Sequence, residues 1–248
     1  MIVLKTPVEI EVMREAGRIT AGALRRVGEA VRPGVTTLEL DVIAEEYIRS
    51  EGAVPAFLGY HGFPATLCTS VNEQVVHGIP GSRVLCDGDI LSVDCGAVVD
   101  GYFGDAAYTF PVGTVSDQAA ALLSATSVSL DAGIAKARPD MRLYDIGSAV
   151  QKVAEAAGFS VVREYVGHGI GRAMHEEPQV PNFGQAGKGL QLKSGMVFAI
   201  EPMINAGGYD VKSLSDGWTV VTSDGALSAH FEHTVAITDD GPVILTCE

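Results

Sequence analysis

The strongest constraint on the fold is an internal repeat in the order of the predicted elements. In each half of the chain, two helical segments precede a series of short apolar runs. Aligned at an offset of 106 residues, the halves share Arg32-Pro33 with Arg138-Pro139, Gly52 with Gly158, and the acidic Glu39 with Asp145. Helices followed by strands indicate an α+β fold. We therefore expect two pseudo-symmetric helix-plus-strand halves around one curved, mainly antiparallel sheet, forming a single domain over residues 1–248.

Capping signals and stop signals locate the helices. Thr6 with Glu9 and Thr36 with Glu39 form capping boxes, which predict helices from Thr6 to about 31 and from Thr36 to about 51. Helices are also predicted over 116–137 and 144–157. Residues 54–112, and the chain after 158, have short apolar runs divided by Gly, Pro and Asp, which predict strands.

The net charge and the cysteine pattern limit which cellular compartment and which binding partners we expect for this chain. With 31 acidic and 17 basic residues the net charge is −14, which argues against direct binding to nucleic acid or to an anionic membrane. The N-terminal residues lack a signal-peptide pattern, and no apolar run is long enough to span a membrane. The four cysteines include no C-x-x-C pair, so we expect free thiols and a cytoplasmic location.

Two aspartates stand in a predicted hairpin. Asp100-Gly101 between apolar runs predicts a two-residue turn, which pairs Val99 with Tyr102 and Gly96 with Asp105. Asp94 then lies on the same face as Asp105, as a diagonal neighbour about 7–8 Å away. The alternative is a pair of solvent-facing aspartates, but Asp94 interrupts an apolar strand, where an unpaired charge is unfavourable.

Two glutamates occupy similar positions in the second half. Glu201 interrupts the apolar run 196–204 and follows Asp94 by 107 residues, close to the repeat offset. Glu232 is predicted within the last strand, with His230 and Thr234 on the same face by period-2 alternation. A single glutamate in a strand usually faces solvent. Four acids at apolar strand positions, drawn from both halves, instead favour a shared site.

Three histidines are candidates for the same site. His168 has glycines on both sides, which permit close backbone approach, whereas His77 and His175 have no distinguishing spacing and could be structural. Carboxylates with one imidazole suit Mn, Fe, Co or Zn. Two divalent ions would balance four carboxylates, and such a pair can activate water and polarise a carbonyl. The residues therefore predict a dimetal hydrolase.

At these residues the sequence resembles the type I methionine aminopeptidases, which have the pita-bread metalloprotease fold. The resemblance covers almost the whole chain. It is carried by Met13–Gly17, Ser70–Glu73 with His77–Pro80, Asp94–Asp105, Gly167–Gly171, His175–Val180, Glu201-Pro202 and Glu232–Thr234.

The resemblance implies a metal-dependent aminopeptidase that removes the initiator methionine when the second residue is small, using a metal-bridging hydroxide. The implied metal ligands are Asp94, Asp105, His168, Glu201 and Glu232. Asp105 and Glu232 would bridge two ions, with His168 and Glu201 on one and Asp94 on the other. By the same resemblance Glu201 would also move a proton. His175 would contact the scissile carbonyl oxygen, and His77 the amide nitrogen.

The resemblance also implies a methionine side-chain pocket, formed by Tyr60, Phe63, Cys68 and Trp218. Apolar, aromatic and sulfur-containing walls suit a flexible thioether. Phe57, Phe63 and Met174 differ from residues that are common in bacterial members. A monovalent cation near Asn72, Gln74 and Ser228 is implied as well.

Two other classes of protein remain alternatives. Prolidase and aminopeptidase P share the five-ligand set but carry an N-terminal domain, which we do not expect here. A non-enzymatic pita-bread protein that binds nascent chains or ribosomes would typically lack metal ligands, whereas all five are present. We expect a monomeric enzyme that acts on the N-terminal Met of nascent peptides, with the ribosome as a further partner.

Overall fold

The computed structural model describes residues 2–247, in which four α-helices and fifteen strands form two similar halves. The helices are α1 (Pro7–Ala30), α2 (Thr37–Ser50), α3 (Asp117–Ile134) and α4 (Leu143–Ala156). A short 3-10 turn, η1 (Tyr60–Gly62), lies between β1 and β2. Within residues 2–247, no helix is both long enough and apolar enough to cross a membrane.

The strands are short except for one long hairpin. Those of the first half are β1 (Val54–Pro55), β2 (Leu67–Val71), β3 (Gln74–Val76), β4 (Ile90–Val99) and β5 (Tyr102–Pro111). Those of the second half are β6 (Ser160–Val161), β7 (Gly167–Gly169), β8 (Glu176–Val180), β9 (Val197–Ile200), β10 (Met203–Asn205), β11 (Val211–Ser213), β12 (Val220–Thr222), β13 (Ser228–His230), β14 (His233–Thr238) and β15 (Gly241–Ile244).

The repeat predicted from the sequence is also present in the structure. Helices α2 and α4 have equal length and start 106 residues apart. Their first turns are closed alike, because Glu39 accepts a hydrogen bond from the Thr36 amide and Asp145 accepts one from the Arg142 amide. This shared cap is the physical reason for the match between Glu39 and Asp145. Two predicted boundaries shift, since α3 ends at Ile134 and α4 begins at Leu143.

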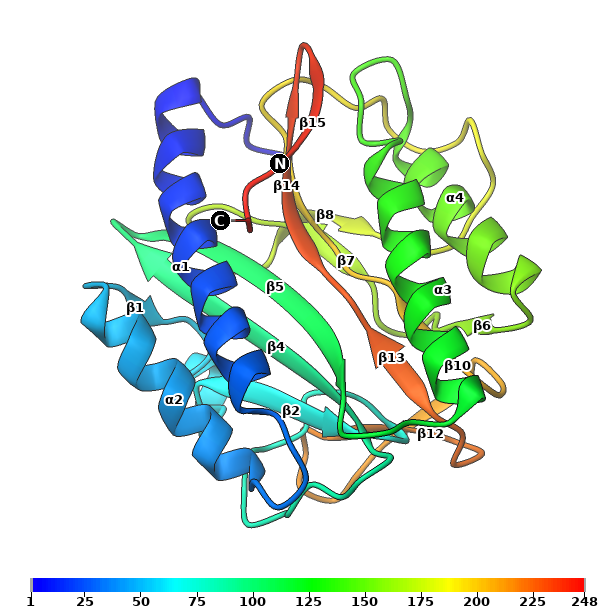
Figure 1. The fold of residues 1–248 in the computed structure, drawn as a ribbon. Coiled ribbons are helices and arrows are strands. Elements are labelled where there is room, and N and C mark those ends of the chain that lie inside the picture. The colour runs from blue at the N-terminus through cyan, green and yellow to red at the C-terminus, as the bar shows by residue number, and fades with distance from the viewer. Residues whose placement is uncertain (1, 248) are drawn as a thin grey trace.

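Antiparallel pairs join the strands of residues 2–247 into four sheets. Strand β4 pairs with β1, β2 and β5, while β14 lies between β15 and β9, and the sheet continues from β9 to β7 and β8. Figure 1 shows α1 and α2 over the first half and α3 and α4 over the second, on the same side of the strands. The observed α+β architecture agrees with the predicted one.

The two faces of the sheet differ in chemistry. In β4, Val93 and Cys95 belong to the core cluster beneath α1 and α2. Phe198 and Ile200 of β9 belong to the corresponding cluster beneath α3 and α4. Because side chains alternate along a strand, residues between these positions face away from the helices. Asp94 is one of them, so the helical layer leaves the acids on the opposite, concave side.

The halves join along β5 and β14. The backbone of Ala107 exchanges hydrogen bonds with that of Glu232, and the hydroxyl of Thr234 bonds to the backbone of Asp105. Here the prediction of four acids at strand positions is wrong for two of them: Glu201 lies in the break between β9 and β10, and Glu232 lies in the break between β13 and β14. The backbone of Glu232 bonds to β5 instead of continuing the ladder with β9 and β10, so the strand is interrupted where the halves meet.

Candidate active site

The β4–β5 hairpin places two aspartates side by side. Its register pairs Val99 with Tyr102 and Gly96 with Asp105, as predicted, so Asp94 and Asp105 are diagonal neighbours. Asp105 is buried, and one carboxylate oxygen of each aspartate is buried without a hydrogen-bond partner. The solvent-facing alternative for these two residues is therefore excluded by their placement.

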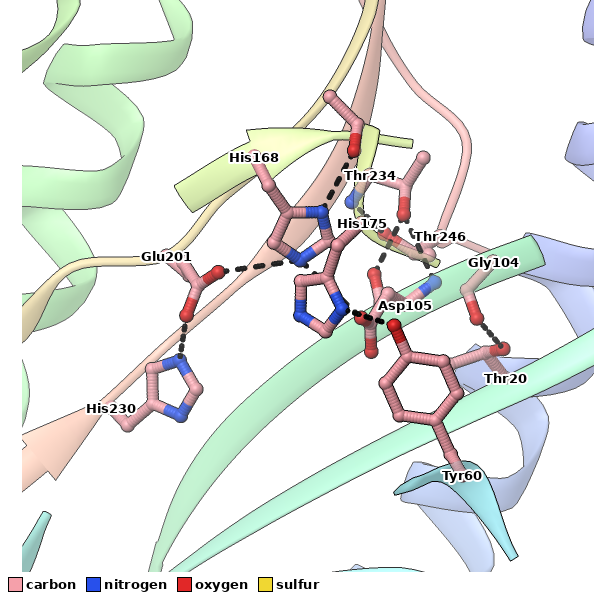
Figure 2. Close-up of polar contacts among 11 residues, drawn as sticks. Thr20, Tyr60, Gly104, Asp105, His168, His175, Glu201, His230, Thr234 and Thr246 are labelled. Carbon is pink, nitrogen blue, oxygen red and sulfur yellow. Dashed lines mark hydrogen bonds and ion pairs between the residues drawn. The ribbon is translucent and has the colours of Figure 1, made fainter. Parts of the chain in front are cut away.

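The second half brings an imidazole and two glutamates to the same point. The Nε2 atom of His168 lies 3.5 Å from Oε1 of Glu201 and 3.9 Å from Oδ2 of Asp105. Glu232 contributes a further oxygen, and single ligand atoms of Asp105, His168 and Glu232 lie within 4.8 Å of one another. Figure 2 shows His168 directed at Glu201 above the strand that carries Asp105.

Local backbone chemistry orients the imidazole of His168. Its Nδ1 atom lies 2.9 Å from the carbonyl oxygen of Gly169, which leaves Nε2 with a free lone pair. The flanking glycines are required by close approach: a Cβ at Gly167 would lie 2.3 Å from Ala199 O, and one at Gly169 would lie 2.3 Å from Glu177 O. Because residues 167 and 169 are glycines, β7 can lie close to both β8 and β9, as the sequence predicted.

The acids repel one another when no cation is bound. Burial, followed by the neighbouring carboxylates, raises the pKa of Asp94, Glu201 and Glu232 well above the usual range. Burial also raises the pKa of Asp105 to about 7. Three buried oxygens have no hydrogen-bond partner within residues 2–247: Asp94 Oδ1, Asp105 Oδ1 and Glu232 Oε1. These orphaned oxygens, beside an imidazole with a free nitrogen, fit the donor set of divalent metal ions.

A second histidine lies against the first. The rings of His168 and His175 have centroids 4.3 Å apart, and the Tyr60 hydroxyl lies 2.8 Å from Nδ1 of His175. Burial lowers the pKa of His175, and burial together with His175 lowers the pKa of His77 to about 4. Both rings are therefore neutral at pH 7 and able to act as hydrogen-bond donors or acceptors.

An apolar pocket adjoins the acids. The edge of Phe63 contacts Trp218 at a centroid distance of 5.0 Å, and both pack with Tyr60 and Cys68. Phe57 and Met174 are buried in the same cluster. A cavity of about 210 Å³ is lined by all eleven predicted site residues. The structure thus brings together every residue that the sequence singled out for the site.

Some residues near the site were not found from the sequence. His61 lines the cavity, and Asn182 donates a hydrogen bond to the backbone carbonyl of Glu201. His230, whose Nε2 lies 3.5 Å from Oε2 of Glu201, is buried, and burial lowers its pKa to about 3. Its spacing two residues before Glu232 was the available signal, and its pairing with Met203 of β10 brings it close to Glu201.

The surroundings of Asn72, Gln74 and Ser228 are also ordered by hydrogen bonds. The Asn72 side chain bonds to Asp89 and to the Ile90 amide, and the Gln74 side chain accepts from the Val71 amide. The Ser228 amide donates to the Asn72 carbonyl. The side-chain oxygens of Asn72 and Gln74 are thus engaged within the protein, so a monovalent cation there would rely on backbone carbonyl oxygens.

Comparison with known proteins agrees with this geometry. Residues 11–239 match metallopeptidase family M24. The chain is 58% identical to a methionine aminopeptidase of Clostridium perfringens and 56% identical to methionine aminopeptidase 1 of Bacillus subtilis, with 99% of each chain covered in both cases.

Solved structures give the same result. A methionine aminopeptidase from Thermotoga maritima superposes with a TM-score of 0.99 at 46% identity, with both chains fully covered. The prolidase of Pyrococcus furiosus shares only the fold: the TM-score is 0.78 at 22% identity, over 99% of this chain and 66% of that one. The chain therefore belongs to metallopeptidase family M24, among its methionine aminopeptidases.

Proposed function

We propose that the protein is a metal-dependent aminopeptidase that removes an N-terminal methionine preceding a small residue. The observation that carries this proposal is the convergence, from both halves, of four carboxylates and His168 beside an apolar pocket. Bound metal ions would neutralise the clustered acids and provide ligand partners for their unpartnered oxygens. The apolar pocket favours an apolar first residue in the substrate. Full-length similarity to methionine aminopeptidases supports the choice of methionine.

The metal ligands in this proposal are Asp94, Asp105, His168, Glu201 and Glu232. Two divalent ions, of Co, Mn, Fe or Zn, would supply a water that is reactive at neutral pH and a Lewis acid for the scissile carbonyl. Glu201 lies at the edge of this group, with one oxygen toward His168. Glu201 would accept a proton from that water and then release it to the departing amine.

The neutral histidines orient the peptide. With Nδ1 of His175 engaged by Tyr60, Nε2 is left to donate a hydrogen bond to the substrate carbonyl oxygen, where negative charge develops. His77 lies against Trp218 at the pocket wall, with ring centroids 6.5 Å apart, and can contact the amide nitrogen of the same bond. Tyr60, Phe63, Cys68 and Trp218 enclose the methionine side chain.

The substrates, the oligomeric state and the cellular location of the enzyme are proposed as well. We infer that the substrates are nascent chains, that the enzyme acts as a monomer in the cytoplasm, and that it works near the ribosome. The net charge of −14 argues against contact with ribosomal RNA unless a local basic patch or a protein partner provides it. We also propose that a monovalent cation binds near Asn72, Gln74 and Ser228.

The test is peptide hydrolysis by metal-free protein reloaded with Mn, Fe, Co or Zn. We expect cleavage of Met-Ala-x peptides and little cleavage of Ala-Pro-x peptides. Preferential cleavage before proline would overturn the methionine assignment. The Asp105→Asn variant, which keeps the size of the side chain, should lose activity with every metal. Retained activity in that variant would overturn the proposed ligand set.

A further inference from the structure

His230 has a buried ring nitrogen without a hydrogen-bond partner among residues 2–247. The residue ends β13 and is 1% exposed. Its Nε2 atom faces Glu201 Oε2 at 3.5 Å, the ion-pair contact drawn as a dashed line in Figure 2, and donates or accepts no hydrogen bond among the described residues. A buried polar atom left without a hydrogen-bond partner is unfavourable. The environment of His230 is therefore complete only when another atom occupies the space in front of Nε2.

The position of that nitrogen matches the spacing of metal ligands. Nitrogen and oxygen ligands lie about 2.0–2.2 Å from Zn²⁺-sized ions, so neighbouring donors on one ion are about 3–3.5 Å apart. Glu201 has an imidazole nitrogen at 3.5 Å from each of its oxygens, His168 on one side and His230 on the other. Single ligand atoms of Glu201, His230 and Glu232 all lie within 4.8 Å of one another.

We propose that His230 is an additional metal ligand, and that its Nε2 binds the divalent ion held by Glu201 and Glu232. This inference rests on the metal centre of the proposed function and adds a sixth side chain to the five ligands assigned there. The centre then has imidazole donors on both sides of Glu201. Because imidazole suits Zn, Fe and Co better than Mn or Mg, His230 tunes the centre toward the first group of ions.

The decisive experiment counts metal–nitrogen bonds. The full-length protein, labelled with nitrogen-15 in its histidines and freed of metal, is loaded with cadmium-113. Scalar coupling between the metal and a ring nitrogen is then recorded for each histidine. We expect coupling to Nε2 of both His168 and His230. In His230→Gln, one coupled nitrogen should disappear while that of His168 remains.

The possible results separate this inference from the proposed function. Coupling to His168 alone would overturn the role of His230 as a ligand and leave the metal centre in place. Coupling to neither histidine would overturn the metal centre itself. The matched control is His233→Gln, because Nδ1 of His233 lies 2.8 Å from the Thr246 hydroxyl and His233 is not part of either ligand group. This variant should retain both couplings.

Calorimetric titration with Zn²⁺ and with Mn²⁺ tests the selectivity. We expect His230→Gln to weaken Zn²⁺ binding on the order of tenfold or more. Mn²⁺ binding should weaken by about threefold or less, because Mn²⁺ depends more on the carboxylates. His233→Gln should change neither affinity. An equal loss for both ions in His230→Gln would overturn the tuning role.

Discussion

The Tyr60 hydroxyl lies 2.8 Å from Nδ1 of His175, and this contact determines which ring nitrogen remains available to a substrate. A neutral imidazole carries one proton. If the hydroxyl donates to Nδ1, the proton of His175 resides on Nε2, where it can stabilise an oxygen that gains negative charge. Tyr60 comes from the η1 turn of the first half and His175 from the loop before β8, so the two halves jointly fix this donor.

Replacing Tyr60 by Phe removes the hydroxyl and keeps most of the pocket wall. A hydrogen bond of this kind contributes about 1 kcal/mol, so kcat for a Met-Ala-x peptide should fall about fivefold, with a smaller change in KM. Steady-state kinetics on the metal-loaded protein measures both. A raised KM with unchanged kcat would show that Tyr60 only shapes the pocket.

The metal-free protein should lose stability as the pH rises above about 6.5. In the fold, the buried carboxyls hold protons that the unfolded chain has already released. The pKa of Asp105 is raised from 3.8 to about 7, and burial raises the pKa values of Asp94 and Glu232 well above their usual range. The free energy of unfolding therefore falls with pH in this window. The buried histidines act in the opposite sense, since the pKa of His168 is lowered from 6.5 to about 4. Their contribution stops changing once the unfolded histidines are also neutral.

Thermal unfolding from pH 6.5 to pH 8, with and without saturating Mn²⁺, measures this effect. The bound metal should raise Tm most at the higher pH, because it replaces the protons on the carboxylates. A metal-free Tm that increases over this range would contradict the prediction.

The sequence predicted most where a feature is local. The capping boxes of Thr6 and Thr36 and the Asp100-Gly101 turn each involve a few adjacent residues, and all three form as predicted. The turn fixes the register, so the relation of Asp94 to Asp105 followed from it. The grouping of acids from both halves was inferred from charge and from family resemblance.

The sequence predicted least where the halves meet. Glu232 leaves the strand because its backbone bonds to Ala107 of the other half, a contact 125 residues away that strand periodicity does not encode. The contact between His230 and Glu201 accompanies the pairing of His230 with Met203 of β10, which is likewise not encoded in the local sequence. The ion pair between Lys5 and Glu176 likewise joins residues that are far apart in the sequence, and no local sequence pattern predicts it.

Lys5 and Glu176 form a largely buried ion pair that holds the loop carrying His175. Lys5 donates to one oxygen of Glu176, while the other oxygen accepts from the amides of Arg172 and Ala173. The Lys5 side chain is 4% exposed. Lys5→Met leaves the carboxylate unpaired, and should reduce the free energy of unfolding by about 3 kcal/mol and lower kcat. Urea unfolding and peptide kinetics measure the two effects.

The matched control for the ion pair is Arg14→Met, which removes an exposed pair with Glu11. Exposed pairs contribute less than about 1 kcal/mol, so this variant should differ little from the parent. Equal losses in the two variants would mean that the Lys5 pair is no more important than a surface pair.

Trp218 should control the binding of the methionine side chain more than the chemistry. Its ring contacts Phe63 edge-on, with an interplanar angle of 76°, and forms one wall of the pocket. Trp218→Ala should raise KM for Met-Ala-x peptides about tenfold, with a smaller change in kcat. Tyr209→Ala, at an aromatic residue that is 42% exposed and outside the pocket, should leave both constants unchanged. A loss confined to kcat would assign Trp218 to the chemical step.

Thr234 should link the metal site to the joint between the halves. Its buried hydroxyl donates to the Asp105 carbonyl at 2.8 Å and accepts from the Asp105 amide at 3.0 Å. Thr234→Val keeps the shape but leaves both backbone groups unpaired, so the free energy of unfolding should fall by about 2 kcal/mol. Because Asp105 is then less firmly held, Zn²⁺ affinity should fall on the order of tenfold. The control is Thr238→Val, because the Thr238 hydroxyl donates to the Gly241 carbonyl at the β14–β15 turn. This variant should keep the parent affinity. Lost stability with unchanged affinity in Thr234→Val would mean that the β4–β5 hairpin alone positions Asp105.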